Sequence, residues 1–222
     1  FELLDLTGLD VSHPVMESVY EQYYQEPRYR PNVLTKQMLT AKQLGRKTGQ
    51  GFYRYEAGQK LDEQPAIRVE KLAEYPTVWI AADFEADRQI LTDYLNIHKI
   101  AIDTQDHPAA DSLILVASYG EDTSSSIQRL NLDATRTVAI DLINGLNVHR
   151  TLMPSLITQE KLSQAAHSIF NLDGNSVSVI QESVGFVAQR VIAMVINLAC
   201  DIAQQGVATV DDINAAVRLG LG

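Results

Sequence analysis

The spacing of apolar residues divides the 222-residue chain into segments of different character. Residues 1–56 carry apolar side chains three or four positions apart, which predicts helices. The clearest series is Val15, Met16, Val19, Tyr20 and Tyr23. Residues 57–75 are polar and predict a linker. Helical spacing returns over residues 183–222.

Short apolar runs alternate with amphipathic stretches over residues 76–182. Buried strands separated by helices are typical of a parallel sheet that is covered on both faces. We therefore predict an α/β fold: a reduced, Rossmann-like parallel sheet flanked by helical segments. The predicted strands are 78–82, 99–103, 112–117, 137–141 and 176–180, and the predicted helices are 85–95 and 159–170.

The last segment predicts a long helix with one buried apolar face. The residues of that face are Val187, Val191, Met194, Val195, Leu198 and Ile202. Cys200 lies in the same apolar stretch, so we expect it in the core. Because it is the single cysteine, an intrachain disulfide is excluded, and a reduced, cytoplasmic setting is expected.

Charge and hydropathy argue against two classes of partner. The chain has 18 basic and 28 acidic residues, a net charge of −10, and no basic run longer than Arg46-Lys47. Nucleic acid is not expected, because binding phosphates requires clustered Lys and Arg. No run of about 18 consecutive apolar residues occurs, and residues 1–5 lack the basic n-region of a signal peptide, so we expect no membrane anchor.

The turn after the first predicted strand is where a Rossmann fold holds the pyrophosphate of NAD. That contact requires Gly-x-Gly-x-x-Gly, so that backbone amides can approach the phosphates. Residues 81–87 contain no glycine and three carboxylates, those of Asp83, Glu85 and Asp87. Asp103 stands where a ribose-binding acid is expected, but without the glycines we interpret this as coincidence. The segment is therefore predicted to bind no NAD.

Other chemistry in the chain is sparse. The carboxylates of residues 83–87 also fit the Mg²⁺ site of a receiver-type phosphorylation domain. This alternative is weakened because Ser118-Tyr119 and Glu182-Ser183 stand where that domain needs an aspartate and a lysine. The five histidines show no metal-ligand spacing, so no metal is expected. Residues 123–126, Thr-Ser-Ser-Ser, predict a polar loop.

Both ends of the chain resemble the C-terminal domain of 3-hydroxyacyl-CoA dehydrogenases. Residues 1–10 (FELLDLTGLD) and 44–55 (LGRKTGQGFYRY) resemble the second half of that domain. Residues 184–190 (VGFVAQR), 205–213 and 219–222 resemble its opening half. Residues 76–182 are similar to the reduced Rossmann-like domain of long bacterial 3-hydroxybutyryl-CoA dehydrogenases.

The resemblance implies a function for a longer parent protein in fatty acid metabolism. The parent would be an oxidoreductase that oxidises 3-hydroxyacyl-CoA to 3-oxoacyl-CoA with NAD, and its NAD domain and catalytic His–Glu pair would lie upstream of Phe1. Gln189 stands where the family has an asparagine near the substrate. This copy of the module is therefore expected to be non-catalytic.

The same resemblance suggests substrate contacts and partners. Arg46 and Lys47 are candidates to meet a CoA phosphate, although a solvated or helix-capping role is equally open. Neither half-module can bury its apolar face alone. We therefore expect the halves to pair, within one chain or between the two chains of a homodimer, and to form a dimerisation and acyl-CoA-enclosing scaffold without activity of its own. A stand-alone α/β binding or regulatory domain is the alternative.

Overall fold

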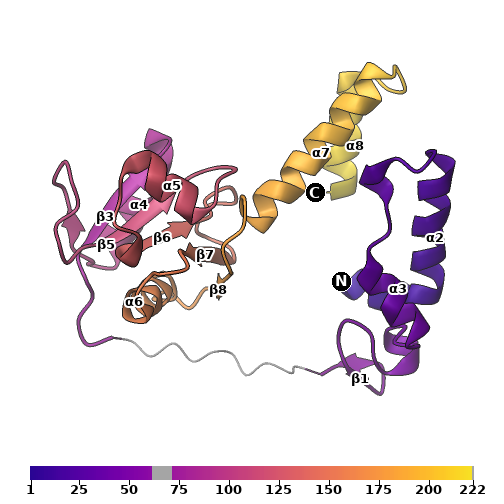
Figure 1. Cartoon of the computed structure of the whole chain (residues 1–222), viewed down its shortest axis with the longest axis horizontal. Coiled ribbons are helices and arrows are strands. Elements are labelled where there is room, and N and C mark those ends of the chain that lie inside the picture. Colours follow the sequence, from indigo (N-terminus) through magenta and orange to yellow (C-terminus); the bar gives the residue numbers. More distant parts are fainter. Residues whose placement is uncertain (62–71, 222) are drawn as a thin grey trace. The chain divides into compact units, whose positions relative to one another are not determined.

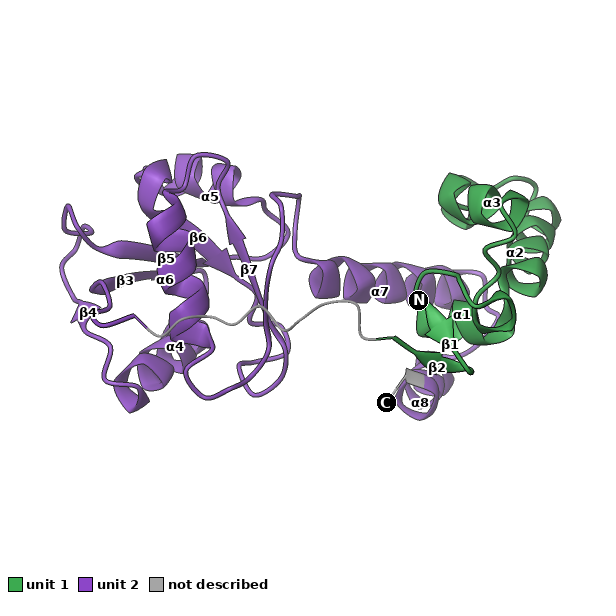
Figure 2. Cartoon of the chain, turned by 90° about the horizontal axis from the view of Figure 1, so that it is seen from below, with its two compact units in different colours: residues 1–68 green, residues 69–222 purple. Residues whose placement is uncertain are grey.

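A computed structural model of the chain describes residues 1–61 and 72–221. The chain divides into two compact units, residues 1–68 and 69–222 (Figure 2). Residues 62–71 of the predicted linker lie outside the described residues. Each unit is described separately below.

Unit 1 is helical and ends in a small hairpin. Its α-helices are α1 (Glu2–Thr7), α2 (Leu9–Gln22) and α3 (Val33–Thr40). Short 3₁₀ turns η1 (Pro27–Tyr29) and η2 (Arg46–Thr48) connect them to the hairpin strands β1 (Tyr55–Glu56) and β2 (Gln59–Lys60). The helical spacing of residues 1–56 thus corresponds to helices, with β1 at the end of the segment.

A buried carboxylate holds unit 1 together. Asp5 is fully buried and accepts hydrogen bonds from the backbone N–H groups of Phe52 and Tyr53, both at 2.9 Å, and from the Tyr55 hydroxyl at 3.0 Å. A Cβ atom on Gly51 would lie 2.2 Å from Asp5 Oδ1, and one on Gly45 would lie 2.3 Å from the Asp5 carbonyl oxygen. Glycine is therefore required at both positions, because the turn packs directly on α1.

Unit 2 contains a six-stranded sheet with the order β4-β3-β5-β6-β7-β8 (Figure 1). The strands are β3 (Val78–Ala82), β4 (Ile102–Asp103), β5 (Leu113–Ala117), β6 (Thr137–Ile140), β7 (Arg150–Pro154) and β8 (Val177–Val179). The helices are α4 (Glu85–Ile97), α5 (Thr123–Leu130), α6 (Glu160–Phe170), α7 (Val187–Gln204) and α8 (Val210–Leu221), with η3 (Ala134–Arg136) before β6.

The sheet is mostly parallel, as predicted, but not wholly so. Strands β4, β3, β5 and β6 are mutually parallel, whereas β7 runs antiparallel to β6, and β8 is parallel to β7. The prediction of a parallel sheet was therefore wrong at β7, a strand that the apolar pattern did not reveal. The first residue of β7, Arg150, is buried and forms a bidentate ion pair with Asp173. Nη1 lies 2.7 Å from Oδ1 and Nη2 lies 2.5 Å from Oδ2.

The two faces of the sheet are covered differently. Helices α4 and α6 pack on one face through residues such as Leu91, Leu95 and Phe170, and form the larger core (Figure 2). The other face carries a smaller cluster that includes Met153 and the fully buried Phe186. Phe186 immediately precedes α7, so this long helix is anchored to the sheet at its first turn.

Three expectations about local structure were wrong. Residues 123–126 form the first turn of α5, not a loop, because Asp122 accepts a hydrogen bond from the Ser125 N–H and caps the helix. The predicted buried face of α7 is largely exposed: Val187, Val191 and Met194 are 53%, 57% and 45% exposed. Cys200, expected in the core, is exposed as well.

Candidate functional site

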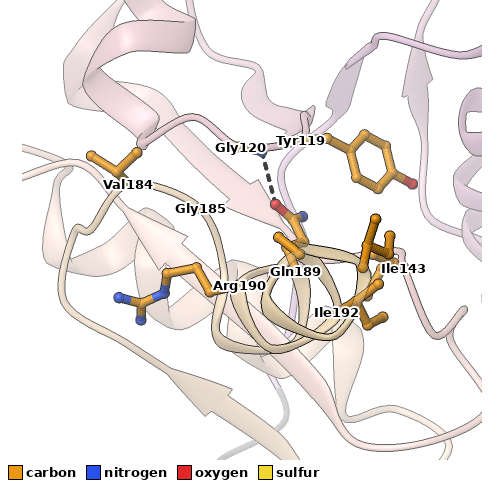
Figure 3. Close-up of a pocket in the computed structure, with 10 residues that line it drawn as sticks. Tyr119, Gly120, Ile143, Val184, Gly185, Gln189, Arg190 and Ile192 are labelled. Atoms are coloured by element: carbon orange, nitrogen blue, oxygen red, sulfur yellow. Dashed lines mark hydrogen bonds between the residues drawn. The ribbon is translucent and has the colours of Figure 1, made fainter. Parts of the chain in front are cut away.

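A crevice lies where α7 begins, at the carboxyl ends of β5 and β6 (Figure 3). In open α/β sheets ligands bind at this edge. Its volume is about 500 Å³, and its walls are mainly apolar, with Ile143, Val184, Ile192 and Ile196 among the lining residues. The Tyr119-Gly120 backbone and Gln189 supply polar groups.

Gln189 extends into this crevice and uses both ends of its amide. Its Oε1 accepts a hydrogen bond from the Gly120 N–H at 3.0 Å, drawn in Figure 3. Its Nε2 donates to the Ser118 carbonyl oxygen at 3.2 Å and to Asp141 Oδ1 at 3.0 Å. Gln189 is 8% exposed, although it lies on the first turn of an otherwise exposed helix. The site residue predicted from the motif therefore lies at the sheet edge.

The local sequence explains why α7 starts at this point. The Gly185 N–H donates to the Glu121 carbonyl oxygen at 3.0 Å, and Gly185 has φ of 70°, a conformation that favours glycine. Phe186 then enters the core, and the next turn of the helix carries Gln189. The motif thus places a fixed amide against the ends of β5 and β6.

Tyr119 has no free hydroxyl to offer a substrate. Its hydroxyl donates to Asp87 Oδ2 at 2.9 Å, and its ring meets Phe84 edge to face, with the ring centroids 5.6 Å apart. Burial, followed by the hydrogen bond to the Asp87 carboxylate, raises the pKa of the Tyr119 hydroxyl. It is therefore a poor proton donor.

The residues after β3 do not fit a dinucleotide. Asp83 Oδ1 accepts from Arg129 Nη2 at 2.9 Å, and the same guanidinium pairs with Glu121. Glu85 and Asp87 occupy the first turn of α4, where a pyrophosphate would have to sit, and their charge opposes it. Asp103 instead organises its own loop by accepting from the Gln105 and Ala109 N–H groups and the Ser112 hydroxyl. Those hydrogen bonds, the one from Ala109 first, lower the pKa of Asp103.

The arrangement also argues against a receiver-type Mg²⁺ site. Asp83 pairs with Arg129, whereas Asp87 accepts from Tyr119, so the two carboxylates have separate partners. Among residues 1–61 and 72–221, no group of three or more His, Cys, Asp or Glu side chains is placed to hold a metal ion.

Arg46 and Lys47 lie on the turn of unit 1 that Asp5 fixes. Lys47 Nζ lies 2.6 Å from Asp10 Oδ1, and this ion pair lowers the pKa of the Asp10 carboxyl. The Arg46 guanidinium carbon lies 5.5 Å from the centre of the Tyr55 ring. Both side chains are exposed, so they are accessible to an anion, but Lys47 already has a partner.

One part of the chain passes a simple test for a membrane span. Within the described residues, α7 is the one helix that is long and apolar enough to cross a membrane, judged by length and composition. A helix from the interior of a multi-helix domain passes the same test, and a single such helix is weak evidence.

The two ends of the chain match one family model. Residues 1–55 and 185–222 match the 3-hydroxyacyl-CoA dehydrogenase C-terminal domain. The resemblance stated from the sequence is thereby confirmed for these two segments. The sheet-forming residues lie between the two matched segments along the chain.

Individual relatives extend the match over the whole chain. The 3-hydroxyadipyl-CoA dehydrogenase of Escherichia coli K12 is 27% identical over 220 residues, 99% of this chain and 40% of that protein. The crystal structure of an Escherichia coli K12 3-hydroxybutyryl-CoA dehydrogenase superposes with a TM-score of 0.65 and 25% identity, again over 99% of this chain and 40% of its own. A Mycobacterium tuberculosis 3-hydroxybutyryl-CoA dehydrogenase is 43% identical over 53 residues, 24% of this chain and 18% of that protein. The chain thus spans two fifths of the relatives that it matches along its length.

Proposed function

We propose that this chain is a non-catalytic scaffold within an NAD-dependent 3-hydroxyacyl-CoA dehydrogenase, an enzyme of fatty acid metabolism that converts 3-hydroxyacyl-CoA to 3-oxoacyl-CoA. The observation that carries the proposal is the similarity to two Escherichia coli dehydrogenases over 99% of the chain. The carboxylates after β3, which oppose a pyrophosphate, support placing NAD binding in another part of the parent protein. A cytoplasmic location stays a prediction.

Exposed apolar faces on the helical segments support a dimeric scaffold. In unit 1 Leu3, Leu6 and Val15 are more than half exposed, and in unit 2 Val191 and Ile196 are both 57% exposed. Apolar surface of this extent favours association with matching surface. We propose that these segments form the homodimer contact and help to enclose acyl-CoA.

The dimer contact is tested by charge substitution on α7. Val191→Glu is expected to shift the chain towards monomer in sedimentation velocity, because the glutamate would be desolvated in the contact. Val148→Glu is the matched control: Val148 is 50% exposed but lies on the sheet-containing part of unit 2, so it should leave the association unchanged. Equal behaviour of the two variants would contradict this contact.

Arg46 and Lys47 remain a proposed contact for a CoA phosphate. In an active protein that contains this chain, the double substitution to alanine is expected to raise KM for an acyl-CoA but not for the matching acyl-pantetheine, which lacks the nucleotide phosphates. An equal effect on both substrates would assign the two residues a structural role.

The function itself is tested with a chimera. This chain would replace the matching 40% of the Escherichia coli 3-hydroxyadipyl-CoA dehydrogenase. We expect the chimera to reduce NAD with 3-hydroxyacyl-CoA, and the 222-residue chain alone neither to turn over nor to quench NADH fluorescence. A folded chimera without activity would favour the alternative of a separate binding or regulatory domain. Saturable NADH binding by the chain alone would contradict the assignment of its sheet.

A further inference from the structure

The crevice at the start of α7 presents a specific set of hydrogen-bonding groups. The Gln189 amide on its wall contacts one donor, the Gly120 N–H, and two acceptors, the Ser118 carbonyl oxygen and Asp141 Oδ1. Asp141 Oδ1 also accepts from the Ile143 N–H at 3.2 Å. A primary carboxamide has the complementary set, since its oxygen accepts and its NH₂ group donates twice. Gln189 supplies this group from within the chain.

Two of the three groups around the amide belong to buried residues, Ser118 and Asp141, whereas Gly120 is exposed. Ser118 is 2% exposed and Asp141 is 9% exposed. A buried polar group that loses its hydrogen-bond partner is costly, and such groups are rarely left unpaired. With the Gln189 amide removed, the three partners would face the space that the amide had filled, next to a crevice of about 500 Å³.

The other polar side chains nearby have partners or directions that exclude them from this role. The Tyr119 hydroxyl is held by Asp87. Arg190 extends away from the Gln189 amide in Figure 3. Gln189 is therefore the side chain that pairs with the hydrogen-bonding groups of Gly120, Ser118 and Asp141.

We propose that the crevice is a recognition site for a primary carboxamide and that Gln189 occupies it as an intramolecular ligand. The site is closed in the native chain and opens to small carboxamides when the Gln189 amide is removed. This proposal deepens the proposed scaffold function and rests on it. It explains how Gln189 closes the edge of the sheet at which open α/β folds bind ligands, and so connects α7 to the sheet.

The test uses Gln189→Ala in the 222-residue chain, with acetamide as the probe. Acetamide corresponds to the atoms that the substitution deletes beyond Cβ. We expect the variant to melt at a lower temperature than the native chain, and acetamide to raise its melting temperature along a saturable curve, because a ligand that binds only the folded state stabilises it. The Gly120 amide resonance should shift along the same curve.

Two controls isolate the carboxamide. Gln164→Ala makes the same truncation on α6, where the exposed Gln164 Nε2 donates only to Glu160 at 3.0 Å, so acetamide should give no saturable stabilisation. N,N-dimethylacetamide, which has no N–H, should not stabilise Gln189→Ala. Identical responses of the native chain, Gln189→Ala and Gln164→Ala to acetamide would overturn the proposal.

A measurement on the native chain covers the case in which Gln189→Ala does not fold. The side-chain NH₂ protons of Gln189 should exchange with solvent roughly tenfold or more slowly than those of Gln164, because only the former are buried and bonded at both sites. Equal exchange rates would overturn the proposal. None of these readouts involves dehydrogenase activity, so this inference and the proposed function fail separately.

Discussion

Replacing Asp5 with alanine should strongly destabilise unit 1 and leave the stability of unit 2 unchanged. The substitution removes the acceptor of the Phe52 and Tyr53 N–H groups and of the Tyr55 hydroxyl. An unpaired buried donor costs roughly 1–3 kcal/mol. Because residues 52 and 53 are half-buried and water can reach them in part, we take the lower half of that range for each of the three donors, about 4 kcal/mol in total.

That cost is large for a unit of this size. A domain has roughly 0.05–0.15 kcal/mol of stability per residue, which gives about 3–10 kcal/mol for residues 1–68. Asp5→Ala should therefore remove roughly two fifths or more of the stability of unit 1. Asp5→Asn keeps the shape of the side chain and one acceptor oxygen, so the stability of its unit 1 should lie between those of Asp5→Ala and the native chain. Asp10→Ala is the control, because it removes only the exposed pair with Lys47.

Two probes separate the units. The single tryptophan, Trp79, lies on β3 and reports on unit 2, while hydrogen exchange of peptides from residues 1–60 reports on unit 1. We expect Asp5→Ala to speed hydrogen exchange in those peptides and to leave the urea midpoint of Trp79 fluorescence unchanged. Native protection in residues 1–60, or an equal shift of the tryptophan transition, would refute the reasoning.

Three further predictions concern unit 2. The Arg150 guanidinium lowers the pKa of Asp173 from its ordinary value of 3.8 to about 2 in the folded state, so the pair adds stability above pH 4 that is lost as pH falls from about 4 to 2. Asp173→Asn should remove roughly 2 kcal/mol of this acid dependence, measured as urea midpoint against pH, and an unchanged acid dependence would contradict this role of the pair. Cys200 should react with a maleimide at a free-thiol rate in dilute solution and more slowly as concentration rises, and a rate independent of concentration would argue against a dimer through α7. Phe186→Ala should cost about 3–5 kcal/mol and release the first turn of α7, seen as faster amide exchange there, whereas unchanged exchange would show that Phe186 is not the anchor.

The sequence predicted the buried parallel strands and the helices α4 and α6, but not α5. The strand predicted over 78–82 is β3, and the helix predicted over 85–95 is α4 with two more residues. Such strands can be recognised in a sequence because both of their faces are buried and the apolar run is continuous. The prediction failed at β7, where Arg150 and Pro154 interrupt the apolar run, since the burial of Arg150 depends on Asp173, 23 residues away.

The candidate site was predictable only in part. The motif around Gly185 and Phe186 located Gln189, but the partners of its amide lie 48 to 71 residues away along the chain. No local sequence pattern predicts such contacts, because they depend on where β5 and β6 end in space. The central role of Asp5 was hidden for the same reason: its partners lie 47 to 50 residues further on.

The ends of the six-stranded sheet restrict how this protein can assemble. Its two outermost strands, β4 and β8, contain only 2 and 3 residues. Edges this short offer few unpaired backbone groups to a neighbouring chain, so growth of the sheet from copy to copy is disfavoured. Self-association is thereby directed away from backbone pairing, and side chains decide which surfaces meet.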